Sequence, residues 1–169
     1  MVFGKLARVT NSISPLYLNG EAIEYVSSVK CLGFFIKSDV QFRFSIAEDL
    51  CKFFGAANSV LNVLTRPSEE VLMKLLYSNC VPILSYGAAV KDFSITAREK
   101  QQLNVAINNA VRRIFSFRQW QSIRQLREFL HYDSIEVIFA KARRQFNRSL
   151  ISHSNETLKF LSTVVVEVE

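Results

Sequence analysis

The amino-acid sequence predicts an α+β fold that is mostly α-helical, in which a small N-terminal antiparallel β-sheet precedes a bundle of about five helices. Short apolar runs separated by turn residues fill the first 36 positions. From residue 44 onward, apolar residues recur at three- and four-residue steps, which is typical of helices. Apolar residues make up 49% of the 169 positions, which is enough to bury a core and excludes a disordered chain.

The first two strand segments are predicted near the N-terminus. Met1–Phe3 forms a short apolar edge strand. Residues 15–23 contain Asn19 and Gly20 at their centre, the pair that a two-residue type I′ turn prefers, so we expect a β-hairpin there.

A third strand is predicted at Val29–Ile36, and it carries Lys30 and Gly33. A glycine inside a strand leaves room for another backbone to come close. Because Lys30 adds a positive charge beside that opening, we expect the strand to hold something bulky and charged.

Residues 44–64 are predicted to form the first helix, because their apolar side chains share one stripe. The stripe consists of Ile46, Leu50, Phe53, Phe54, Ala57, Val60, Leu61 and Leu64. Pro67 breaks this helix, and Ser68 is placed to cap the next one. We expect Pro82 to kink or end the second helix, and Tyr86-Gly87 to terminate the segment.

Two capping boxes predict where the next helices begin. Thr96–Glu99 opens a third helix that runs to about Phe115. Its inward residues are Leu103, Ala106, Ile107, Ala110, Val111 and Ile114. Ser122–Gln125 opens a short fourth helix that runs to Leu130.

A fifth helix is predicted to begin at a cap supplied by Asp133 or Ser134. Its apolar stripe consists of Ile135, Ile138, Phe139, Ala142, Phe146 and Leu150. Beyond it, residues 155–161 are predicted to form one more short helix, and residues 163–169 have the composition of a strand.

The charge and cysteine content narrow the class of protein. Lys and Arg exceed Asp and Glu by 21 to 15, which suits a polyanionic partner, although a charge of this size also simply favours solubility. Cys31, Cys51 and Cys80 are too widely spaced for a disulfide framework or a zinc site, so we expect buried, inert thiols. With no signal peptide and no apolar run of about 18 residues, we expect an intracellular protein of the cytoplasm or nucleus with no membrane partner.

The sequence contains no recognisable catalytic or metal-binding residues. Glycine-rich phosphate loops and serine-nucleophile motifs are absent. The acidic residues Asp39, Asp49, Asp92 and Asp133 are each isolated, so we expect them to be solvated charges or helix caps. No catalytic site and no metal site is therefore predicted.

The basic residues predict a binding surface. Lys141, Arg144 and Arg148 are spaced so that they share one face of the fifth helix, where they could follow a phosphate backbone. The alternative is an ordinary solvated helix face. Trp120 lies next but one to Arg118 and could stack on a base; the alternative is that it packs against a helix end.

Two segments resemble the reverse transcriptases of non-LTR (LINE-type) retrotransposons. Residues 29–33, Val-Lys-Cys-Leu-Gly, resemble the strand that grips the primer in that family. Residues 75–88 resemble its signature L-Y-x-x-x-V-x-P-x-L-x-Y-G, and the order and spacing of the two segments also fit. Met1–Lys5 resembles the end of the preceding palm strand.

The resemblance implies an organisation and a function. Residues 1–40 would be the end of the palm with the primer-grip-like strand, 41–117 a thumb-like helical bundle, and 118–169 a C-terminal helical extension. The chain would be a fragment of an RNA-directed DNA polymerase without the catalytic Asp pair. The parent polymerase uses Mg²⁺, whereas no cofactor is expected in this chain.

The partner implied by the resemblance is an RNA–DNA or DNA template–primer duplex, bound weakly. The expected nucleic-acid-binding residues are Lys30, Gly33, Lys141, Arg144 and Arg148. A palm edge without its covering strands would also favour self-association.

Two positions depart from the family's pattern. Cys31 stands where an aromatic residue commonly precedes Leu-Gly, and Val90-Lys91-Asp92 stands where a Trp commonly follows Tyr-Gly. The zinc-knuckle cysteines of some members are missing. The alternative function is a helical protein–protein interaction module with no role in nucleic-acid binding.

Overall fold

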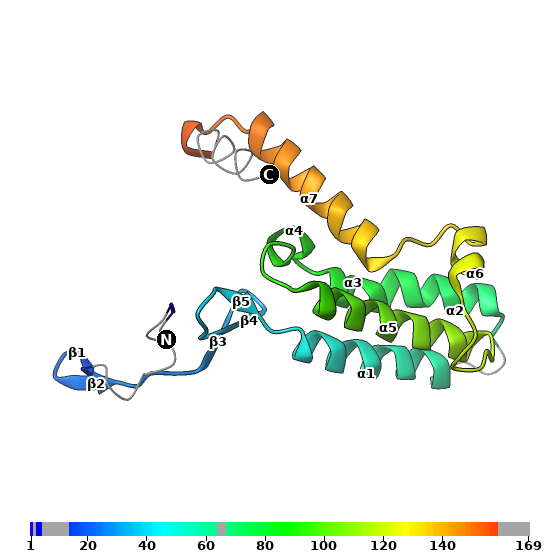
Figure 1. Ribbon diagram of the computed structural model, residues 1–169, viewed down its shortest axis with the longest axis horizontal. Helices are drawn as coiled ribbons and strands as arrows, with labels where there is room; N and C mark the ends of the chain where they lie inside the picture. The colour runs from blue at the N-terminus through cyan, green and yellow to red at the C-terminus, as the bar shows by residue number, and fades with distance from the viewer. Residues whose placement is uncertain (2, 5–13, 64–66, 159–169) are drawn as a thin grey trace. The chain divides into compact units, whose positions relative to one another are not determined.

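The computed structural model describes residues 1, 3–4, 14–63 and 67–158. The chain divides into two compact units, residues 1–51 and 52–169, and Figure 1 shows strands in the first and helices in the second. The predicted fold class is confirmed, because small N-terminal antiparallel sheets precede a mostly helical chain.

The first sheet is the predicted hairpin. Strands β1 (Leu16–Leu18) and β2 (Glu21–Ile23) pair antiparallel. Asn19 and Gly20 join them with φ values of 52° and 87°, and positive φ at both positions is what a type I′ turn requires.

The second sheet corrects the prediction of a single strand at residues 29–36. Strand β3 (Ser28–Cys31) turns back into β4 (Phe34–Lys37), and β5 (Arg43–Phe44) completes a sheet of order β3-β4-β5. Leu32 and Gly33 form the connecting turn, with φ values of 48° and 84°. Gly33 therefore lies at a hairpin turn, where it supplies a left-handed backbone conformation rather than space inside a strand.

A cluster of aromatic rings forms the core of the first unit. Phe44 is buried, and the centroids of its ring and those of Phe34 and Phe42 are 5.1 Å and 5.0 Å apart. Phe3 extends the cluster towards the N-terminus, 5.8 Å from Phe42. Met1 and Phe3 lie in no strand, and Val2 is outside the described residues, so the predicted edge strand is not observed.

The helices follow one another with short breaks. The first helix begins three residues later than predicted, because residues 43–44 pair with β4 instead. The helical elements are α1 (Ala47–Val63), α2 (Glu69–Leu75), the π-helix η3 (Leu76–Cys80), α3 (Val81–Ser85), α4 (Ala88–Lys91), α5 (Ala97–Ile114), α6 (Arg124–Phe129) and α7 (Ile135–Ser152).

Pro82 kinks the second predicted helix, as expected, and the kink takes the form of a π-turn. Proline has no N–H, and its ring would meet the carbonyl of Ser78 in a regular α-helix. The backbone widens over η3 instead, and the Val81 N–H bonds the carbonyl of Leu76, five residues back. Gly87, with φ of 62°, then ends the segment as predicted.

Most predicted caps are confirmed. The hydroxyl of Ser68 accepts a bond from the Val71 N–H, and Thr96 and Glu99 form a full capping box. Ser134 rather than Asp133 caps α7, by accepting a bond from the Val137 N–H.

The second predicted capping box is wrong. Helix α6 begins one residue later than expected, with Ile123 at its N-cap. The Ser122 hydroxyl accepts a 3.4 Å bond from the N–H of Arg124, two residues on, and so satisfies a donor of the first turn without forming the box.

The core of the second unit is centred on α5. Its predicted inward residues are all buried, and α2 and α7 pack against it. On α7, Ile135 and Phe139 are completely buried, whereas Phe146 is 38% exposed. The second half of the α7 stripe is therefore only partly covered.

The last predictions fall near or beyond the end of the described chain. Residues 156–158 form one helical turn, and the rest of the predicted helix at 155–161 and the strand at 163–169 lie outside the described residues. Among the described helices, none is long and apolar enough to cross a membrane.

Candidate nucleic-acid interface

Lys30 and Gly33 lie on one hairpin of the first unit. Lys30 is exposed on β3 directly opposite Phe35 of β4, and its Nζ lies 5.7 Å from the centroid of that ring. A cation over an aromatic face is held without losing its charge. The hairpin therefore presents a positive charge two residues before the turn that Leu32 and Gly33 form.

The other three predicted binding residues lie on α7, and the structure divides them into two kinds. The Nζ of Lys141 is 2.5 Å from Asp133 Oδ2, so its charge is largely compensated. Arg144 and Arg148 are exposed and make no ion pair within the described part of the chain. The predicted cationic face thus contains two arginines whose charge is fully available.

Arg143, on the same helix, serves packing instead. Its guanidinium lies 4.7 Å from the centroid of the Phe93 ring, and its Nη1 is 3.7 Å from Asp92 Oδ2. Lys100 of α5 also forms an ion pair with Asp92, whose side chain is only 9% exposed. Of the two expectations for Asp92, a solvated charge is wrong, since its side chain joins the end of α4 to α5 and α7. The residue does stand at a helix end, as the C-cap of α4.

A groove of about 860 Å³ runs between α5, α6 and the start of α7. Its lining is mostly polar and includes three arginines, three carboxylates and two asparagines. These residues are Arg112, Arg124, Arg127, Glu128, Asp133, Glu136, Asn104 and Asn108.

Two of the groove arginines are held by neutral acceptors. Arg112 donates from Nε to the Gln121 carbonyl at 3.1 Å and from Nη1 to Asn109 Oδ1 at 3.0 Å. Arg127 donates from Nη1 to Asn108 Oδ1 at 3.1 Å. A neutral acceptor fixes a guanidinium in place and leaves its positive charge uncancelled.

The groove carboxylates are each engaged. Glu128 pairs with Arg124 at 2.9 Å, and Asp133 pairs with Lys141. Glu136 accepts a bond from the buried Asn104, whose own oxygen accepts the Ile135 N–H at 3.0 Å. Burial would raise the pKa of Glu136, but hydrogen bonds, chiefly that from Asn104, and the nearby charge of Arg127 lower it overall.

Tyr132 forms an aromatic part of the groove wall. Its ring stacks on Tyr77, with centroids 4.0 Å apart and planes 19° from parallel. Burial raises the pKa of Tyr77, although the charge of Arg127 opposes the shift. The stack joins η3 to the segment that precedes α7.

Trp120 is 76% exposed, so the alternative in which it packs against a helix end is wrong. It lies in a turn that two hydrogen bonds close: the Gln121 N–H donates to the Arg118 carbonyl at 3.0 Å, and the Arg118 N–H donates to Gln121 Oε1 at 2.6 Å. Because Arg112 also holds the Gln121 carbonyl, the turn that displays Trp120 is attached to the groove.

The sequence did not reveal the groove, because its walls come from segments about thirty residues apart. One signal was available. Asn104 interrupts the apolar stripe of α5 next to Leu103, and a buried polar side chain needs a hydrogen-bonding partner from elsewhere in the fold.

The three cysteines differ in their exposure to solvent. Cys80 is buried as expected, whereas Cys31 and Cys51 are exposed, which corrects the prediction of three buried thiols. Cys31 lies at the end of β3 beside the turn, and Cys51 lies on the outer side of α1. Within the described residues, no group of three or more His, Cys, Asp or Glu side chains could hold a metal ion.

Comparison with protein-family models, with curated proteins and with solved structures found no match for this chain. The candidate site is therefore defined by its own residues: a cationic hairpin in the first unit, and two available arginines and a polar groove in the second.

Proposed function

We propose that this chain is a fragment of an RNA-directed DNA polymerase of the non-LTR retrotransposon type, without the catalytic Asp pair, and that it retains weak binding of a template–primer duplex. The observation that carries the proposal is the outer face of α7, where Arg144 and Arg148 are exposed without an ion-pair partner among the described residues. Cations placed one helical turn apart contact successive phosphates irrespective of base sequence.

The order of the two family-like segments supports the same proposal. The segment that resembles the signature supplies buried residues to the core of the second unit, namely Leu76, Cys80, Val81, Leu84 and Ala88. Its Pro82 and Gly87 set the π-turn and the break that follows. The residues of the signature therefore have a structural reason for their spacing in this chain.

The hairpin of the first unit is the second proposed contact. Lys30 would meet a backbone phosphate, and Gly33 would contribute by shaping the turn beside it. A nucleic-acid backbone that approaches this hairpin meets the exposed Lys30. No carboxylate of the described residues cancels the charge of this lysine.

Replacement of Lys141, Arg144 and Arg148 by Gln tests the α7 contact. We expect weaker binding to an RNA–DNA duplex, whatever its sequence, and a log–log salt dependence that is shallower by roughly two units, one for each available arginine. Because Asp133 already compensates Lys141, the single variant Lys141→Gln should change the slope less than Arg144→Gln.

A matched triple variant controls for the loss of three charges. Lys52, Lys74 and Arg98 are exposed on α1, α2 and α5, and their replacement by Gln removes the same net charge. If both triple variants weaken duplex binding equally, only the net charge matters and the α7 contact is rejected. Unchanged affinity and slope in the α7 variant would mean that these cations merely keep the helix solvated.

The alternative function, a protein-interaction module, is favoured by one specific observation. Leu16, Tyr17 and Leu18 of β1 are each more than half exposed, and exposed apolar strands readily pair with another chain. Sedimentation at micromolar concentration in high salt distinguishes the two functions. A monomer that binds no apolar dye would exclude the interaction module, whereas a salt-resistant dimer without duplex affinity would favour it.

A further inference from the structure

We propose that the groove and the turn beside it bind single-stranded nucleic acid, with a base stacked on Trp120 and the neighbouring phosphates held by arginines. We call this surface the arginine–tryptophan surface and define it by Arg112, Arg118, Trp120, Arg124 and Arg127. It goes beyond duplex binding on α7, because it uses other residues and a different form of nucleic acid.

The charge of this surface favours an anionic ligand. Arg112 donates to neutral oxygens, so its guanidinium is fixed in position with its charge uncancelled, and a phosphate meets oriented donors. Arg127 also donates to a neutral oxygen, and it lies near Glu136, whose own donor Asn104 is neutral. Arg118 adds an exposed cation before Trp120, whereas Arg124, after it, is paired with Glu128.

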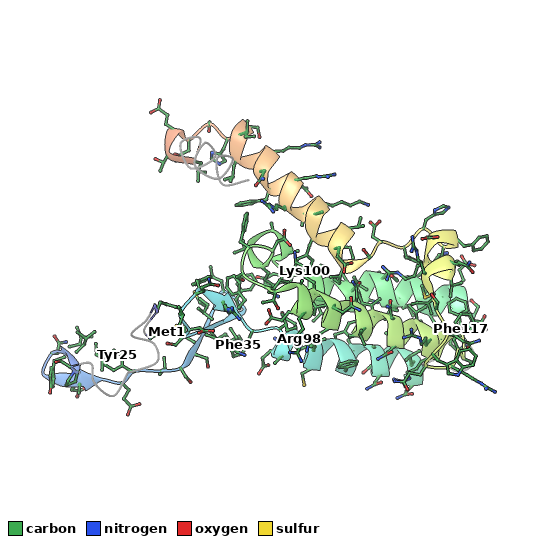
Figure 2. All side chains as sticks on the ribbon, viewed as in Figure 1. Met1, Tyr25, Phe35, Arg98, Lys100 and Phe117 are labelled. Atoms are coloured by element: carbon green, nitrogen blue, oxygen red, sulfur yellow. The ribbon has the colours of Figure 1, made fainter. Side chains whose placement is uncertain are left out.

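The exposure of Trp120 favours a ligand with a flat aromatic group. Tryptophan is usually well buried, and burying this exposed ring gives a substantial apolar gain. The turn that displays it is closed by two hydrogen bonds and attached to α5 by Arg112, so little backbone freedom is lost when a ligand binds. In Figure 2, the labelled Phe117 marks where the chain leaves the C-terminal end of α5 and enters this turn.

A single strand fits this surface better than a duplex does. The bases of a duplex are stacked on one another, so their faces are not available to an indole ring, whereas an unpaired base offers its face. The groove has the volume of a site for a small ligand, which suits one or two nucleotides and is too small for a double helix.

The chain contains one Trp and five Tyr, so fluorescence excited to the red of the tyrosine absorption band reports on Trp120 alone. The experiment titrates the full chain with a 12-nucleotide oligouridylate and, in parallel, with an RNA–DNA duplex of the same length. We expect saturable quenching by the single strand at concentrations where the duplex causes little. Oligouridylate is chosen because it does not fold on itself.

Variants then assign the contact. Trp120→Ala should weaken binding of a labelled oligouridylate by roughly tenfold or more, and Trp120→Phe should restore much of the loss because a ring remains. Arg118→Gln should weaken binding and reduce the salt slope by about one unit, whereas the exposed control Lys52→Gln on α1 should do neither. Because Glu128 compensates Arg124, the variant Arg124→Gln should change the slope less. Trp120→Ala should melt like the parent, since the ring is mostly in solvent.

Each opposite result overturns the proposal. Unchanged affinity in Trp120→Ala, or quenching by inorganic phosphate as strong as by the oligonucleotide, would reduce the surface to a simple anion site. Emission that shifts with protein concentration in the absence of nucleic acid would show that a second copy covers Trp120. The α7 double variant, with Arg144 and Arg148 replaced by Gln, leaves the Lys141–Asp133 pair at the groove intact. It should keep its single-strand quenching, so failure of this proposal and failure of duplex binding are separately visible.

Discussion

At the level of single residues, Leu32 and Gly33 determine the shape of the second sheet, because they form the turn between β3 and β4. A two-residue hairpin turn of type I′ places both residues at positive φ, which glycine accepts readily and leucine accepts at a cost. The turn reverses what reads in the sequence as a continuous apolar run, and it aligns Lys30 with Phe35 across the two strands. Lys30 is therefore held in its exposed position by the turn that Gly33 allows.

Replacing Gly33 by Val should disrupt this hairpin. A β-branched residue at φ of 84° is strained, and we expect a loss of about 1–3 kcal/mol in the free energy of opening the β3–β4 pair, measured by hydrogen exchange of its amides. Duplex affinity should fall only as the hairpin opens.

Another glycine provides a control of opposite sign. Gly55 lies within α1, and a Cβ added there meets nothing within 4 Å, so Gly55→Ala should raise stability by about 0.5–1 kcal/mol. If Gly33→Val leaves exchange at β3 and β4 unchanged but abolishes binding, the glycine serves close approach of a ligand instead.

At the level of elements, two polar contacts hold α7 against the rest of the second unit, in addition to its apolar stripe. Asn104 of α5 bonds the first N–H of α7 and the Glu136 carboxylate, which fixes where the helix begins. Further along, Arg143 meets Asp92 and the ring of Phe93. These two contacts orient α7. They therefore also determine where Arg144 and Arg148, on the same helix, are held.

Asp92→Asn should weaken the second contact. The change leaves Lys100 and Arg143 as partly buried cations with no carboxylate between them, so we expect a loss of about 1–3 kcal/mol in unfolding free energy by denaturant titration. Asp133→Asn removes an exposed ion pair with Lys141 and should cost less than about 1 kcal/mol. Equal effects of the two substitutions would mean that burial at Asp92 has no energetic role.

At the level of the whole molecule, the sequence was most informative where structure depends on neighbouring residues. The Asn19-Gly20 turn, the Ser68 cap and the Thr96–Glu99 capping box each involve residues at most three positions apart, and all were predicted. The turn at Leu32 was missed because leucine is a poor signal for positive φ. The groove and the Asp92 cluster depend on tertiary packing, and no local pattern reveals which distant side chains meet.

The carboxylates of the described residues bear on DNA synthesis by this chain. Two-metal nucleotide transfer uses clustered carboxylates, and the described residues contain no group of three or more His, Cys, Asp or Glu side chains that could hold a metal ion. We expect no DNA synthesis by the purified chain on a primed RNA template, with Mg²⁺ or Mn²⁺, by incorporation of labelled nucleotide. Incorporation that follows the protein through purification would contradict this and place an active site elsewhere in the chain.

The π-turn at η3 has a consequence for comparing this chain with others. The buried residues Leu72, Leu76, Cys80 and Leu84 follow one another every four positions, and in a regular α-helix each such step overshoots a full turn by about 40°. The wider π-turn takes up that overshoot, so the segment behaves as an α-helix with one inserted residue. A homologue without the inserted residue would keep the same apolar face. In an alignment with this chain, it would show a one-residue gap between positions 76 and 80. Such a gap would mark a change from π-helix to α-helix between related chains.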